Sequence, residues 1–72
     1  MLKHDKTEEI EEYKEIFRKV NFIVKRMLEE ENVKKQKGYI HIFESRKKKI
    51  LKEKYGIEWK TTQEMNPDIL ID

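Results

Sequence analysis

The sequence predicts an all-α fold, in which a long first helix packs against a shorter second helix and a short C-terminal helix or tail completes the structure. Two observations lead to this prediction. Apolar residues recur at intervals of three and four through the first half of the chain. Two glycines separate the later segments, while no internal repeat or Pro/Gly-rich linker divides the chain. We expect residues 1–72 to form a single small helical domain.

The first predicted helix covers about residues 7–36. Thr7 can act as its N-cap, or Asp5 with Glu8 can form a capping box. Lysines followed by Gly38 mark its end. The apolar side chains are spaced like those of a helix that packs against another helix. We expect six of them to form a helix interface: Ile10, Tyr13, Phe17, Val20, Val24 and Met27.

The apolar face of this helix is broad. With Ile16, Ile23 and Leu28 it covers an arc of about 140°, which is wider than one shorter helix can cover. A chain below roughly 80 residues has a marginal core, and disulfides are excluded because the sequence has no cysteine. We therefore expect a homodimer that pairs first helices as a bundle. Parallel and antiparallel pairing both stay open, because the clean heptads are too few to fix the orientation.

The second predicted helix covers about residues 40–55, and Gly56 followed by Ile57 fits a Schellman-type stop. Lys47 and Lys54 fall within its apolar face, so we expect their stems to lie over that face and their ammonium groups to reach water. A strand at residues 39–43 stays open as an alternative, because Ile40 and Ile42 alternate with their neighbours. The expected apolar face consists of Ile40, Phe43, Ile50, Leu51 and Tyr55.

The C-terminal segment predicts one short helix at about residues 62–66. Thr61 is its expected N-cap with Glu64 as the capping-box partner, and Pro67 prevents easy continuation. The apolar residues of this segment are expected to form a lid over the two-helix core: Trp59, Met65, Ile69, Leu70 and Ile71.

The net charge of +2 conceals a segregation along the chain. Residues 1–31 carry seven basic and nine acidic side chains, residues 32–60 carry ten basic and three acidic, and residues 61–72 carry three acidic and none basic. A lysine-rich helix face suits phosphate without reading bases. It is also what an ordinary solvated helix face looks like. The candidate phosphate contacts are Arg46, Lys48, Lys49 and Lys52.

Residues 37–44 agree loosely with one segment of the RNA-recognition motif, whose aromatic side chains stack bases on a sheet. Ile40 stands where a small residue is needed, and Glu44 stands where the last aromatic should be. The long first helix also leaves no room for a four-stranded sheet. Gly38 is therefore better explained as a helix terminator.

No catalytic or metal-binding pattern emerges from the sequence. His4 and His41 are far apart, and Ser45 near His41 has no acid or oxyanion hole to work with. We expect no enzyme activity, no metal and no cofactor. No apolar run is long enough for a membrane helix, so we expect no membrane partner and a cytoplasmic location.

Phe22 points away from the apolar face, among charged neighbours. It is an ordinary exposed aromatic, a residue covered by the tail, or an anchor for a partner. Two functions follow from these features. The first is a small regulatory or adaptor protein that acts by protein–protein interaction, as a homodimer and with an unidentified protein partner. The alternative is a small DNA- or RNA-binding regulator that uses the basic face of the second helix.

Overall fold

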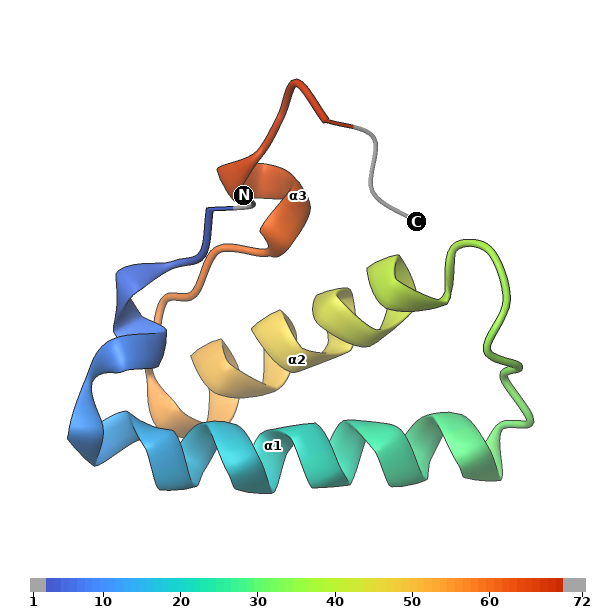
Figure 1. Ribbon diagram of the computed structural model, residues 1–72. Helices are drawn as coiled ribbons and strands as arrows, with labels where there is room; N and C mark the ends of the chain where they lie inside the picture. Colours follow the sequence, from blue (N-terminus) through green and yellow to red (C-terminus); the bar gives the residue numbers. More distant parts are fainter. Residues whose placement is uncertain (1–2, 70–72) are drawn as a thin grey trace.

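Two antiparallel α-helices form a hairpin, and the chain segments on either side of it meet at one end (Figure 1). The structure is a computed structural model and describes residues 3–69. The elements are a 3₁₀ turn η1 (Lys6–Glu9), α1 (Glu11–Glu30), α2 (Tyr39–Tyr55) and the single turn α3 (Thr62–Met65). Residues 3–69 contain no strand. The prediction of an all-helical fold with two main helices packed against each other is confirmed.

The first helix begins later than predicted. Asp5 is the N-cap of η1, and its Oδ1 accepts a hydrogen bond from the Thr7 backbone N–H (2.9 Å). The expected capping box with Glu8 does not form, because the Glu8 carboxylate accepts from the Trp59 indole instead. The turn that Asp5 caps ends after four residues, because Ile10 is extended (φ −71°, ψ 118°). The continuous α-helix starts only at Glu11. The prediction of one helix from Thr7 is therefore wrong at this end.

The first helix also ends six residues before the predicted limit of 36. Asn32 adopts a left-handed conformation (φ 60°). The N–H of Val33 donates to the Leu28 carbonyl (2.9 Å) and the N–H of Asn32 donates to the Glu29 carbonyl (3.1 Å). These are the two hydrogen bonds of a Schellman motif, with asparagine in the place that glycine usually takes. Val33 packs against the core, as the residue after such a stop commonly does.

Glycines bound the second helix at both ends. Gly38 (φ 89°) precedes α2 and Gly56 (φ 66°) follows it. Gly38 therefore starts the second helix and does not end the first. Residues 39–43 lie in α2, which excludes the strand alternative. The predicted stop at Gly56 is confirmed.

A capping box starts α3. The Glu64 N–H donates to Thr61 Oγ1 (3.2 Å), and the Thr61 N–H donates to Glu64 Oε1 (3.0 Å). Of the expected lid, Trp59 is buried and Met65 is half-buried, but Ile69 is 46% exposed, so that part of the prediction is wrong. Leu70 and Ile71 lie outside the described residues.

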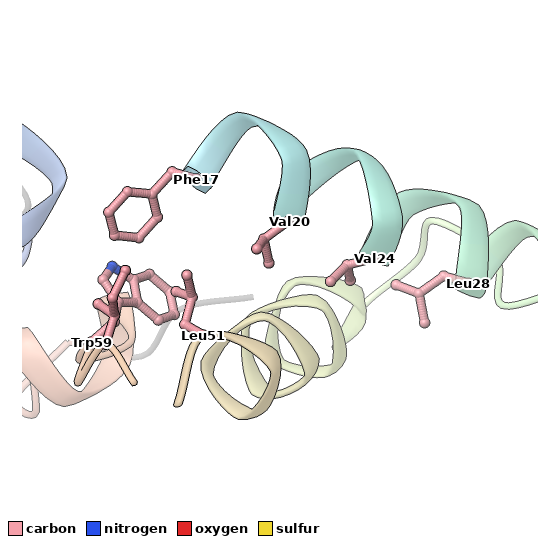
Figure 2. Close-up of a cluster of buried hydrophobic side chains, with 7 residues drawn as sticks. Phe17, Val20, Val24, Leu28, Leu51 and Trp59 are labelled. Carbon is pink, nitrogen blue, oxygen red and sulfur yellow. The ribbon is translucent and has the colours of Figure 1, made fainter. Parts of the chain in front are cut away.

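The core lies along one side of α1. Figure 2 shows the side chains of Val20, Val24 and Leu28 directed toward α2, with Phe17 above the Trp59 ring. Leu51 of α2 is fully buried, and the segment after α2 contributes Ile57 and Trp59 to the core. The buried apolar cluster is Phe17, Val20, Val24, Leu28, Leu51, Ile57 and Trp59.

Candidate functional site

Most of the predicted helix-interface residues are buried or half-buried by contacts within the same chain. Phe17, Val20 and Val24 are buried beneath α2 and the segment that follows it. Tyr13 and Met27 are half-buried. Only Ile10 is exposed, at 42% of its surface. A second copy could therefore reach the middle of this face only if α2 moved away.

Lys47 of α2 lies beneath the protein surface. Its residue is 8% exposed, and its Nζ lies 4.5 Å from the centre of the Trp59 ring and 5.2 Å from the centre of the Phe17 ring. Burial lowers the pKa of Lys47, and the negative charges of Glu8 and Glu44 oppose that change. Lys47 is therefore far more buried than a lysine that extends its charge into water, and two aromatic faces and two nearby carboxylates attract its ammonium group.

Residues 3–9, here called the N-terminal strap, are joined by hydrogen bonds to the segment that follows α2. Glu8 Oε2 accepts a hydrogen bond from Trp59 Nε1 (3.1 Å), and Asp5 Oδ2 accepts one from the Lys60 N–H (2.7 Å). The strap is thereby attached to the segment that follows α2, and Figure 1 shows the two running side by side.

The far end of the strap is held by the side chain of Asn66. The Lys3 N–H donates to Asn66 Oδ1, and Asn66 Nδ2 donates to the Lys3 carbonyl, both at 2.9 Å. Asn66 Nδ2 also donates to the Thr62 carbonyl (2.8 Å). Asn66 itself is buried, as is its bond to Thr62, whereas its two bonds to Lys3 are partly buried.

A carboxylate of α2 fixes the position of α3. Glu44 Oε1 accepts a hydrogen bond from the Thr62 N–H (2.9 Å), and Glu44 Oε2 accepts one from Thr62 Oγ1 (2.7 Å). Both oxygens of this side chain are therefore engaged with the start of α3.

Two of the four candidate phosphate contacts are paired with carboxylates. Arg46 makes a two-bond ion pair with Glu31 (2.5 and 2.7 Å), which lies just after α1. Lys48 Nζ contacts both carboxylate oxygens of Glu64 (2.6 and 2.8 Å). The hydrogen bonds from Arg46 lower the pKa of Glu31, and the Lys48 ammonium group does the same for Glu64. The positive charge of this face is therefore smaller than the sequence suggests.

Lys49 and Lys52 are the other two candidates, and both are exposed. They border a shallow depression between α2 and the start of α3, together with Ser45 and the Thr61 side of α3. Neither lysine takes part in an ion pair within residues 3–69. The ammonium groups of the two lysines and the two neighbouring hydroxyl groups could donate hydrogen bonds to phosphate oxygens.

Phe22 is 62% exposed on α1. It borders a shallow depression that is open to solvent, where α1 faces the first turns of α2. Ile40 and Phe43 of α2 line the same depression and are each half-buried, and Lys25 lies at its edge. The described part of the tail does not cover Phe22, so the reading in which the tail shields it is wrong for residues up to 69.

No metal-binding or catalytic arrangement of side chains is found among residues 3–69. No group of three or more His, Asp or Glu side chains could hold a metal ion there. His41 and Ser45 lie on α2 beside Arg46 and Lys49, around one shallow surface depression. Within the same described residues, no helix has the length and apolar character needed to cross a bilayer.

No protein-family model, curated protein or solved structure matches this chain. Function is therefore inferred from the surface of the molecule alone. Sequence reasoning found Phe22 but missed its neighbours Ile40 and Phe43, because both were assigned wholly to the core. It also missed the pairing of Arg46 and Lys48, because Glu31 and Glu64 lie 15 and 16 positions away along the chain.

Proposed function

We propose that the protein is a small non-enzymatic adaptor or regulator that acts by binding another protein. The observation that carries the proposal is the exposure of Phe22 at an apolar depression bordered by α1 and α2. Aromatic side chains are enriched in protein–protein interfaces, and they dominate the binding energy when a partner covers them. At 62% exposure, most of Phe22 remains available for contact with a partner.

The test compares Phe22→Ala with Ile42→Ala. Ile42 is also exposed on a helix surface, but it lies on α2 away from this depression. Both variants should keep the wild-type unfolding free energy to within about 0.5 kcal/mol, because both residues are exposed. A protein captured by the immobilised wild-type chain and by Ile42→Ala, but not by Phe22→Ala, would support the proposal. Nuclease treatment should leave that capture unchanged, and equal capture by both variants would contradict it.

The second candidate function is contact with DNA or RNA phosphates, which the exposed pair Lys49 and Lys52 favours. Glu31 and Glu64 give a sensitive test, because each neutralises one neighbouring cation. The variant Glu31→Gln/Glu64→Gln should bind a labelled duplex or single-stranded probe more tightly than the wild type, and salt should weaken that binding steeply. The variant Lys49→Gln/Lys52→Gln should lose it. No retardation of either probe by any of these proteins at low salt would exclude this function.

Self-association also stays a proposal. The central residues expected to pair first helices, Phe17, Val20 and Val24, are covered within one chain. A homodimer would therefore need another contact surface or an exchange of chain segments.

A further inference from the structure

The N-terminal strap (residues 3–9) is joined to the rest of the chain by side-chain hydrogen bonds at three places. Asn66 holds the backbone of Lys3, Asp5 holds the backbone of Lys60, and Glu8 holds the indole of Trp59. All three contacts are made to residues that follow α2, none of which is a sequence neighbour of the strap. The same contacts could form with those residues in a second copy of the chain.

The joint between the strap and α1 is a poor helix start. Ile10 is the N-cap of α1, and its side chain cannot accept a hydrogen bond from the first turn. The turn before it is well capped by Asp5 but ends after Glu9. Exposed glutamates lie on both sides of Ile10, and their negative charges stabilise the positively charged N-terminal end of a helix. Local signals therefore favour a continuous helix, and the contacts of the strap oppose it.

We propose that two copies of this chain exchange their N-terminal straps. In the exchanged dimer Ile10 becomes helical, and one helix of roughly 37 Å runs from Lys6 to Glu30. Each strap then leaves its own Trp59 and binds Lys60, Trp59 and Asn66 of the other copy. The side-chain contacts of the strap are kept, while Ile10 leaves its extended conformation and the 3₁₀ turn Lys6–Glu9 becomes α-helical. Exchange of an identical element in this way is a low-cost route to dimers. The core residues of α1 stay buried against α2 throughout.

The dimer does not depend on the proposed binding of another protein, and its test needs no such partner. Ile10 is exposed, so substitution there should disturb packing little. Ile10→Ala favours the helical joint, whereas Ile10→Gly disfavours it. Because each dimer contains two joints, the dissociation constants of these variants should differ by about twentyfold, with Ile10→Ala the tighter. Sedimentation equilibrium over a series of concentrations measures this difference.

Crosslinking identifies which residues meet across the dimer. The chain has no natural cysteine. Lys3 and Met65 border the same surface depression, and Lys3 binds Asn66 through backbone atoms, so Lys3→Cys keeps that contact. Chains carrying Lys3→Cys and chains carrying Met65→Cys are unfolded together, refolded at high concentration and treated with a short bis-maleimide. We expect crosslinked pairs that contain one chain of each kind.

The double variant Lys3→Cys/Met65→Cys is the control for reach, and it should crosslink within one chain at low protein concentration. Strap exchange is supported if crosslinked pairs form that contain one chain of each kind, and if their yield increases when both chains also carry Ile10→Ala. Internal crosslinking without mixed pairs, whether or not a dimer sediments, overturns it. A chain that stays monomeric at every concentration even with Ile10→Ala also overturns it.

Discussion

The ammonium group of Lys47 lies 4.5 Å from the centre of the Trp59 ring, inside the contact between α2 and the segment that follows it. Phe17 faces the same group from α1 at 5.2 Å. One charged side chain thus lies at the meeting point of three chain segments. Attraction to the rings and to Glu8 and Glu44 opposes the cost of removing the charge from water.

Replacing Lys47 with methionine should stabilise the protein. Methionine keeps most of the stem that fills this space and removes the buried charge, whose pKa is lowered because the effect of burial exceeds the attraction of Glu8 and Glu44. We expect the free energy of unfolding of Lys47→Met at neutral pH to rise by about 1 kcal/mol, measured by urea denaturation. Lys52→Met is the control, because Lys52 is exposed and should change stability by less than about 0.5 kcal/mol. A clear loss in Lys47→Met alone would mean that the attractions are the larger effect.

The effect of Lys47 on stability should depend on pH. Because its folded pKa lies below its unfolded value of about 10.4, the unfolded chain binds more protons in the interval between the two. The unfolding free energy of the wild type should therefore rise with pH in that interval relative to that of Lys47→Met. Urea titrations from neutral pH to about pH 10.5 should show the difference between the two proteins shrinking. A difference that grows with pH would contradict the sign of the pKa change.

Asp5→Ala should destabilise the protein at neutral pH by about 1 kcal/mol, the usual cost of losing an N-cap side chain. Burial opposes ionisation of Asp5, but hydrogen bonds from the N–H groups of Thr7 and Lys60 outweigh it and lower the pKa. The stabilisation is therefore present above pH ~4 and is lost as pH falls through the lowered pKa. Acid denaturation curves of wild type and variant should converge in that range. Asp68→Ala, at an exposed position, is the control and should change the unfolding free energy at neutral pH by less than about 0.5 kcal/mol.

Asn32→Gly should raise the unfolding free energy by about 0.5 kcal/mol, and Asn32→Ala should lower it by about 1 kcal/mol. The left-handed backbone at this position costs a residue with a Cβ atom more than it costs glycine, and asparagine is intermediate. Thermal unfolding of the two variants against the wild type measures both effects. If alanine were tolerated as well as glycine, α1 would not end in the observed motif.

The helical hairpin could be predicted because its signals are local. Two such signals can be read within a few residues of sequence. One is the spacing of Phe17, Val20 and Val24, which predicts a helix, and the other is the glycine after Tyr55, which predicts a helix end. The break at Ile10 could not be predicted, because it depends on contacts with Lys60 and Trp59, which lie 55 and 51 positions from their partners Asp5 and Glu8. Local preference in that segment still favours a helix, and tertiary contacts override it.

The candidate surface was predictable only in part. An exposed Phe22 follows from the helical periodicity, but its neighbours on α2 depend on the angle between the helices. The position of Lys47 was missed because lysine usually extends its charge to water, and the two aromatic rings that receive it come from separate segments. The end of α1 near Asn32 was not predicted, because Gly38 is the stronger helix-termination signal in the sequence.

The contact between Lys3 and Asn66 joins residues that are 63 positions apart. During synthesis on the ribosome, the hairpin of α1 and α2 has both of its halves available well before Asn66 emerges. Lys3 therefore cannot make this contact until almost all of the described chain has been synthesised. We expect this closure to be the last step of folding, and the first contact to open when the native protein begins to unfold.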